Sequence, residues 1–238
     1  MVRGSTGVNS RGMLLAIGFG LAASLSLLSA GPAFSVNAPE QQQLVDKARM
    51  TLEAFTADEG MKGALKEMGK DAKGLFIIPQ FMRGAFIIGG AGGSGVLIVR
   101  DEKSGKWSDP VFYNIGSASF GLQIGGDVSE MVLVVRTQKG LEEFYSNDFK
   151  LGANAGIAAG PVGAGVSAKG IAADIVAYAK KKGAFGGIAA DGSLVSVSND
   201  SNKAYYGKEV RPTDIVVKKD VGNPKSLPLR EAAEKLMK

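Results

Sequence analysis

The stretch that decides the fold is Gly89-Gly90-Ala91-Gly92-Gly93-Ser94-Gly95-Val96-Leu97-Ile98-Val99, because it joins a glycine-rich run directly to a β-branched one. Formally, Gly90–Gly95 matches the G-x-G-x-x-G pattern of a dinucleotide site. That pattern binds pyrophosphate only where it opens a helix whose N-terminal amides face the phosphates. Here Val96–Val99 follows instead, and such a run is typical of a strand. We therefore predict a glycine-rich bend in a sheet, and no nucleotide site.

Short apolar runs between glycines continue on both sides of this stretch, and each predicts a strand. The first group comprises Leu75–Ile78, Ala85–Ile88, Val96–Val99, Val111–Ile115, Phe120–Ile124 and Met131–Val135. After a short helix capped by Thr137, strand-like segments resume at Leu151–Ala168, Ile171–Ala179, Ala184–Ala189 and Leu194–Val197. Between two of the strands, Asp101–Lys106 has the composition of a hairpin loop.

Apart from the short helix after Thr137, helical periodicity occurs at the two ends of this strand-rich region. Apolar residues at three- and four-residue steps predict a helix over Pro39–Phe55. Thr56-Ala57-Asp58-Glu59 reads as a capping box for a second helix that continues to about Asp71. Short helices are predicted at Asn202–Tyr206, ending at Gly207, and around Leu229 to Leu236. We expect an α+β fold, with N-terminal helices packed on a strongly curved, mainly antiparallel, glycine-rich sheet or partial barrel.

Composition excludes several chemistries. The 238 residues include no Cys and no His, which removes His-based triads, Cys nucleophiles, thiolate or imidazole metal sites and disulfides. No Walker A sequence and no calcium-loop spacing occur, and we predict no cofactor, no metal site and no catalytic residues. The formal net charge is +5, without the Lys/Arg density of a nucleic-acid binder, so no nucleic-acid partner is predicted. This positive net charge is compatible with an anionic partner but does not require one.

The N-terminal segment has the layout of a secretory signal peptide. Arg3 and Arg11 precede the apolar run Met13–Leu28, and small residues follow up to Ala33. The run is short for a spanning helix, although an uncleaved anchor is the alternative. We therefore predict a signal peptide over residues 1–33, a binding domain over 39–219 and a C-terminal tail with a short helix over 220–238. The expected location is outside the cytoplasm, periplasmic or secreted, with peripheral attachment to a membrane.

Basic residues around the second predicted helix are the candidate site. They are Lys62, Lys66, Lys70, Lys73 and Arg83. Lysines at four-residue steps are ordinary on a solvated helix face, and that is one interpretation. The functional interpretation is contact with anionic lipid headgroups, to which each such residue contributes about 1 kcal/mol near an anionic membrane. A second cluster, Lys180–Lys182, is expected at a turn.

Six motifs occur once each, in this order, along the chain: Ala72–Pro79, Gly89–Leu97, Trp107–Pro110, Ile115–Gly125, Ala158–Gly163 and Lys203–Gly207. Together they resemble the SYLF-domain family of lipid-binding proteins over about residues 40–215. The resemblance implies no enzyme. Eukaryotic members bind phosphoinositides and work beside actin and endocytic membranes, whereas exported bacterial members are described as lipid-binding or envelope proteins. This chain differs from eukaryotic members in its signal segment and in lacking an attached SH3 or zinc-finger module.

The function predicted from the sequence is therefore an exported, noncatalytic protein that contacts anionic phospholipid through a basic surface. A structural or protein-interaction module of the bacterial cell envelope, with an envelope protein as partner, is the alternative. A small outer-membrane barrel is disfavoured by the two leading helices and the 7% aromatic content. A hydrolase is disfavoured by the missing histidine base.

Overall fold

A computed structural model describes residues 38–85, 88–120, 125–161, 171–181, 183–187 and 190–237. These residues belong to one compact unit. The predicted signal peptide, residues 1–33, lies outside the described part of the chain, and the domain boundaries at residues 39 and 219 stay predictions.

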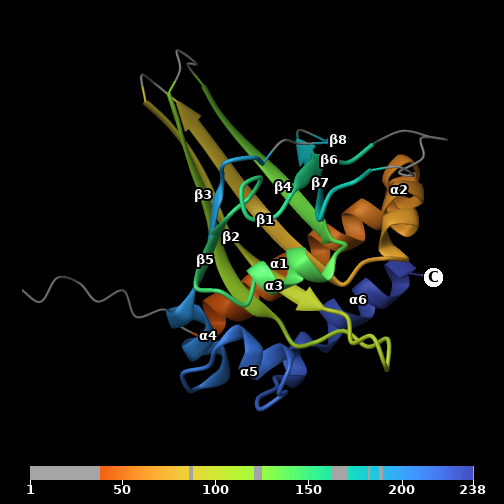
Figure 1. Cartoon of the computed structure of the whole chain (residues 1–238), viewed down its shortest axis with the longest axis vertical. Coiled ribbons are helices and arrows are strands. Elements are labelled where there is room, and N and C mark those ends of the chain that lie inside the picture. The colour runs from red at the N-terminus through yellow and green to blue at the C-terminus, as the bar shows by residue number, and fades with distance from the viewer. Residues whose placement is uncertain are drawn as a thin grey trace, which may run out of the picture. The chain divides into compact units, whose positions relative to one another are not determined.

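Most helices lie toward the two ends of the chain, and the predicted helix after Thr137, α3, interrupts the strands (Figure 1). The helices are α1 (Ala38–Ala57), α2 (Glu59–Gly69), α3 (Gln138–Glu143), α4 (Asn199–Tyr206), α5 (Pro212–Val216) and α6 (Leu227–Met237), with a 3₁₀ turn η1 (Pro224–Ser226). The strands are β1 (Gly74–Ala85), β2 (Ile88–Val99), β3 (Val111–Phe120), β4 (Gly125–Val135), β5 (Asp148–Lys150), β6 (Ile157–Ala159), β7 (Ile175–Lys181), β8 (Ala184–Gly187) and β9 (Leu194–Val197).

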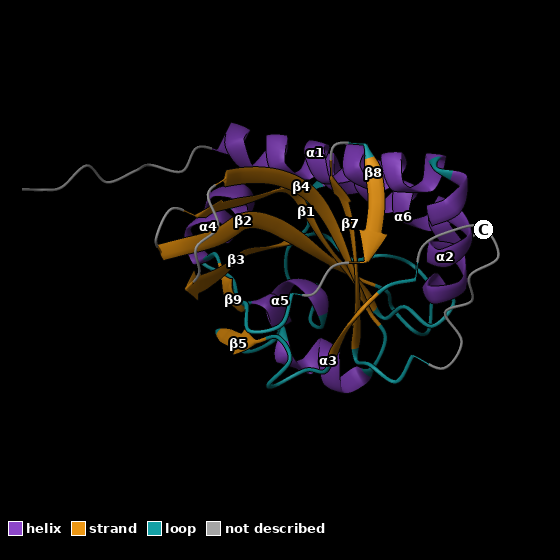
Figure 2. Cartoon of the chain, turned by 90° about the horizontal axis from the view of Figure 1, so that it is seen from above, coloured by secondary structure: helices purple, strands orange, loops and turns teal. Residues whose placement is uncertain are grey.

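The described strands form a single curved sheet in the order β5-β9-β3-β2-β1-β4-β7-β6, with β8 also paired to β7. Neighbouring strands pair antiparallel, except that β6 and β7 run parallel. Figure 2 shows α1 and α6 over one face of the curled sheet and α3 and α5 over the other. The predicted α+β fold with a strongly curved, mainly antiparallel sheet is therefore confirmed.

Side chains of the central strands alternate between two hydrophobic cores. Leu75 and Ile77 belong to the core that also contains the apolar faces of α1, α2 and α6, here called the α1-side core. Phe76 and Ile78 belong to the other, the α3-side core, which includes residues of α3 and α5. Burial on both faces explains why these strands read as continuous apolar runs rather than as an alternating pattern.

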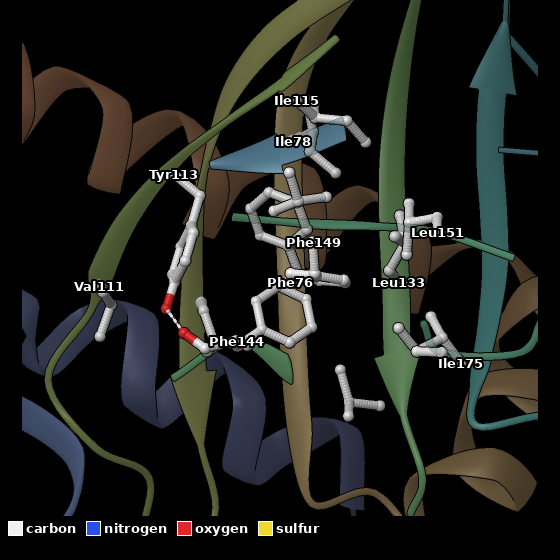
Figure 3. Close-up of a cluster of buried hydrophobic side chains, with 14 of the residues drawn as sticks. Phe76, Ile78, Val111, Tyr113, Ile115, Leu133, Phe144, Phe149, Leu151 and Ile175 are labelled. Carbon is white, nitrogen blue, oxygen red and sulfur yellow. Dashed lines mark hydrogen bonds between the residues drawn. The ribbon is translucent and has the colours of Figure 1, made fainter. Parts of the chain in front are cut away.

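Four aromatic rings organise the α3-side core (Figure 3). Phe144, at the end of α3, meets the rings of Phe76, Tyr113 and Phe149 edge-on, with centroid distances of 5.5, 5.4 and 4.7 Å. Such pairs add about 0.5–1.5 kcal/mol each beyond the burial of area. The buried Tyr113 hydroxyl donates a hydrogen bond to the Phe144 carbonyl oxygen, so its polar end is satisfied. Burial raises the pKa of Tyr113.

Strands β1 to β4 extend beyond most of the two cores as a four-stranded arm (Figure 1). Phe81, near its base, still belongs to the α3-side core. We define the arm as residues 80–85, 88–94, 116–120 and 125–128. Its outer strands lose their neighbours here, because β9 pairs with β3 only up to Gly116 and β7 pairs with β4 only from Ser129.

A bulge in β1 marks the base of the arm. The register of β1 shifts by one residue against both neighbouring strands around Pro79, which has no N–H for a ladder hydrogen bond. Gly93 and Gly95 lie against the bulge. A Cβ atom on Gly93 would lie 2.3 Å from the Gln80 carbonyl oxygen, and one on Gly95 would lie 2.5 Å from that of Ile77. These two glycines are therefore required by close backbone approach.

Three local predictions were wrong. The N-cap of α2 is Asp58, whose carboxylate accepts the Met61 N–H at 3.0 Å, whereas Thr56 still belongs to α1 and donates to the Glu53 carbonyl. Gly90–Gly95 is continuous strand within β2 and no sheet bend, because both neighbouring strands supply ladder partners. Ala85–Ile88 is no separate strand: Ala85 ends β1 and Ile88 begins β2.

The second half of the chain was predicted less completely than the first. In the described part of Leu151–Ala168, only Ile157–Ala159 is a strand, and β7 begins at Ile175 rather than at residue 171. The predicted strand Phe120–Ile124 lies, apart from its first residue, outside the described ranges. Helix α5 and strand β5 were not predicted at all. The C-cap at Gly207 is confirmed, with φ +74°.

Candidate functional site

Helix α2 and its C-cap residue Lys70 carry three of the predicted lysines on a face opposite the buried face of the helix. Lys62, Lys66 and Lys70 follow one another at four-residue steps and are exposed. On the other side, Met61 and Leu65 are fully buried in the α1-side core. The sequence forms this helix despite its glycines because the apolar face packs against α1 and α6.

Two of these three lysines have no acidic partner among the described residues and are available to bind an anion. Lys62 lies 3.7 Å from Glu59 and is partly compensated. Within the described part of the chain, Lys66 and Lys70 form no ion pair or side-chain hydrogen bond. The exposed face of α2 therefore presents a positive charge to solvent, and neighbouring acids neutralise only part of it.

Lys73 lies where the chain leaves α2, beside a surface hollow of about 420 Å³ that Lys70, Arg100 and Arg136 also line. Its ammonium group forms an ion pair with Glu102, and Arg136 lies 4.0 Å from Asp71. The hydrogen bond from Lys219 lowers the pKa of Asp101, a further acid of this hollow. Most charges in the hollow are thus already paired, in contrast to those on α2.

Arg83 does not join the lysines. It is exposed on the arm, ten residues beyond Lys73, and an extended strand of that length spans on the order of 30 Å. Asp127 is its register partner on β4. The structure therefore groups Lys62, Lys66 and Lys70, with Lys73 beside them, and places Arg83 elsewhere.

The second basic cluster lies in a strand rather than at a turn. Lys180 and Lys181 belong to β7, while Lys182 is outside the described residues. Lys181 forms an ion pair of 2.6 Å with Asp127, and Lys180 lies 3.9 Å from Glu130. Both lysines are therefore tied to acids of β4.

Two of the motifs behind the family resemblance hold the C-terminal segment in place. The Asp109 carboxylate accepts hydrogen bonds from the Ser226 hydroxyl at 2.6 Å and from the Asn223 N–H at 3.1 Å. The Tyr206 hydroxyl donates to the Pro110 carbonyl at 2.6 Å. These contacts fix α4 and η1 against the loop between β2 and β3. Their role in the structure is to position the last helix.

Sequence reasoning did not single out an exposed apolar group on one side of the molecule. Met50 on α1, Met82 on β1 and Val128 on β4 are 58%, 54% and 53% exposed. The alternation of side chains along β4 would have placed Val128 on the face that α1 covers, because Val128 shares that face with the buried Val132 and Val134. Met82 could not be assigned in this way, since the bulge at Pro79 reverses the parity of β1.

None of the helices in the described ranges is both long and apolar enough to cross a membrane. The described residues also contain no group of three or more acidic side chains placed to hold a metal ion.

A family model described as "Ysc84: Las17-binding protein actin regulator" matches residues 116–236. LAS seventeen-binding protein 3 of Saccharomyces cerevisiae is 33% identical over 172 residues, which cover 68% of this chain and 37% of the yeast protein. The human SH3 domain-containing YSC84-like protein 1 is 31% identical over 149 residues, covering 61% of this chain and 43% of the human protein. The chain thus spans less than half the length of these relatives. By the extent of the match, the chain belongs to the Ysc84 family, which confirms the resemblance to the SYLF-domain proteins.

Proposed function

We propose that this chain is an exported, noncatalytic protein that binds anionic phospholipid surfaces through the exposed lysines of α2. The observation that carries the proposal is the face formed by Lys62, Lys66 and Lys70, whose charges point away from the core and are only partly compensated. The name of the yeast relative and the description of the family model both name binding, which supports a function in binding rather than catalysis.

The expected strength of this contact is modest and depends on salt. Each lysine near an anionic membrane contributes about 1 kcal/mol, so three of them contribute about 3 kcal/mol. Screening reduces this contribution over a Debye length of about 8 Å at physiological ionic strength. The protein should therefore attach reversibly and dissociate at high salt.

Vesicle co-sedimentation tests the proposal. The wild-type protein should sediment with vesicles of phosphatidylglycerol and phosphatidylcholine, but not with phosphatidylcholine alone. Charge reversal of Lys62, Lys66 and Lys70 to Glu should abolish the difference in protein binding between the two kinds of vesicle. As a control with the same net charge, Lys103, Lys208 and Lys225, which are exposed on other elements, are reversed instead. Equal binding by both triple variants would refute the assignment of the α2 face.

A protein partner is the second candidate, and the names of the relatives favour it. The yeast relative is named for binding LAS seventeen, and the family description names actin regulation. For an exported bacterial protein, the corresponding partner would be a protein of the cell envelope. Capture of such a partner from envelope extracts in the absence of lipid, unaffected by charge reversal on α2, would support this candidate over the first.

Export itself is supported by the order of positive, apolar and small residues in 1–33. Mass spectrometry of the protein recovered from fractionated cells tests it. A mature N-terminus near residue 34 in the periplasmic or secreted fraction is expected, whereas an intact N-terminus in the cytoplasmic fraction would contradict export.

A further inference from the structure

A groove of about 440 Å³ lies between helix α1 and the sheet. Lys47, Met50 and Ala54 form its α1 wall, at helical steps that keep them on one face. Pro79 of the bulge and Val128 of β4 line the sheet side. Met50 and Val128 are more than half exposed, so the groove offers apolar surface to solvent. Polar side chains, among them Gln80 and Glu130, complete its lining.

An apolar track leads from this groove across the arm. Val128, Met82, Gly92 and Gly116 are register partners on β4, β1, β2 and β3, and so share one face of the sheet. Neighbouring strands lie about 4.8 Å apart, so this row is about 14 Å long. The next row toward the tip, of Gly126, Gly84, Gly90 and Ala118, carries no side chain larger than a methyl group. We call these two rows the glycine floor.

Packing inside the chain explains Gly92, whose Cβ atom would lie 3.2 Å from the Ile115 carbonyl oxygen, but it does not explain Gly84 and Gly90. A Cβ atom on Gly84 would meet nothing within 4 Å, and one on Gly90 would meet its nearest atom at 3.8 Å. Gly95, at the bulge, differs because its Cβ would lie 2.5 Å from a carbonyl oxygen. Glycine weakens a strand interior, and at these two open positions the bare backbone leaves room for close approach by a molecule outside the chain.

The distribution of charge selects the kind of ligand. The residues of the floor are all uncharged, and the arm's Arg83 and Asp127 lie on the opposite face. At the groove, Lys47 is exposed and forms no ion pair within the described ranges. The groove wall also contains one acid, Glu130, which lies 3.9 Å from Lys180 and is thereby compensated, so Lys47 is left as the unpaired charge among these groove residues. An uncharged track with a cation at one end complements an amphiphile with an anionic head.

We propose that the groove and the glycine floor hold one acyl chain of an anionic amphiphile, with its head beside Lys47. The row of about 14 Å matches the length of one chain, since a bilayer of two chains has a hydrocarbon core of about 30 Å. Methionines suit such a site because their unbranched side chains adapt to a mobile chain. This inference extends the proposed lipid function from headgroup contact on α2 to a site for a single chain.

Binding of laurate to the purified protein, without vesicles, tests the site by titration calorimetry. Met50→Gln combined with Val128→Thr should weaken binding about tenfold, which corresponds to about 1.4 kcal/mol. The matched control combines Val217→Thr with Leu227→Gln at positions that are 60% and 49% exposed elsewhere. It should bind like the wild type. Equal affinity of the two double variants, or no binding by the wild type, would overturn the proposal.

A second variant separates head from tail. Lys47→Gln should weaken laurate binding about fivefold, the value of one lysine near an anionic group, and leave dodecyl maltoside unaffected. Equal loss for both ligands would overturn the placement of the head. Met82→Gln should weaken both ligands if the chain crosses the floor. Sedimentation that instead shows a dimer abolished by Met82→Gln would make a second copy the occupant and refute an acyl chain.

The test of the acyl-chain site can fail or succeed independently of the test of the α2 lysines. Reversal of Lys62, Lys66 and Lys70 should remove vesicle binding and leave laurate binding intact. If that variant still binds vesicles while the groove variants lose laurate, the headgroup proposal fails and the chain site stands.

Discussion

Replacement of Asn202 by Ala should destabilise the protein strongly, although the residue touches no candidate site. Asn202 is fully buried, and its side chain caps both backbone groups of Phe112. Its Oδ1 accepts the Phe112 N–H at 3.0 Å, and its Nδ2 donates to the Phe112 carbonyl at 3.2 Å. That carbonyl also accepts the Ser198 N–H, but the Phe112 N–H would lose its partner in the variant.

The expected loss follows from these contacts. Loss of the hydrogen bond to the carbonyl costs about 1 kcal/mol, and leaving the buried N–H unpaired costs about 1–3 kcal/mol, so the free energy of unfolding should fall by about 2–4 kcal/mol. For a chain of this size, that lowers Tm by about 5–15 °C. Urea unfolding followed by fluorescence of Trp107, the single buried tryptophan, measures the loss directly.

Asn114→Ala is the matched control for this measurement. Asn114 is exposed and accepts one hydrogen bond from Ser94, at 2.8 Å. Its replacement should change the free energy of unfolding by less than about 0.5 kcal/mol. If Asn202→Ala proved no more destabilising than Asn114→Ala, the role assigned to the buried amide would be wrong.

Three further predictions concern backbone geometry and pH. Gly95→Ala should destabilise the fold by several kcal/mol in urea unfolding, because its Cβ would lie 2.5 Å from the Ile77 carbonyl oxygen; Gly90→Ala, with its nearest contact at 3.8 Å, should be neutral or stabilising, and the reverse order would contradict the bulge argument. Gly207→Ala should cost about 1 kcal/mol, since φ is +74° at this C-cap, and less loss in Gly207→Asn would support the conformational cause. The hydrogen bond from Thr137 holds the pKa of Asp174 below its ordinary value, so its stabilisation is present above about pH 4 and is lost as pH falls through the lowered folded pKa. Asp174→Asn should therefore lower Tm at neutral pH but not in strong acid, and a Tm difference independent of pH would refute this reading.

The fold could be predicted largely from local pattern. Apolar runs such as Met131–Val135 identified the buried parts of the strands, and the helical face containing Leu52 identified α1. The lengths of the strands could not be predicted. Within β2, Gly90–Gly95 has low strand propensity, and ladder partners on both sides keep it extended.

The candidate site was predicted in part. The spacing of Lys62, Lys66 and Lys70 placed them on one exposed helix face without knowledge of tertiary structure. The pairing of Lys73 with Glu102 joins residues distant in sequence, and no local pattern reveals it. The position of Arg83 depends on the length of β1, which was underestimated. The apolar groove requires the packing of α1 against the sheet, and only the structure shows it.

The packing of α6 against α1 also affects the order in which the protein can mature. Val45 near the start of the described chain and Leu229 near its end belong to the same core. During synthesis, the ribosome releases the earlier helix long before its partner exists, so the face of α1 that packs against α6 stays uncovered until the last helix emerges. Until then, a chaperone has access to apolar surface that the finished protein hides.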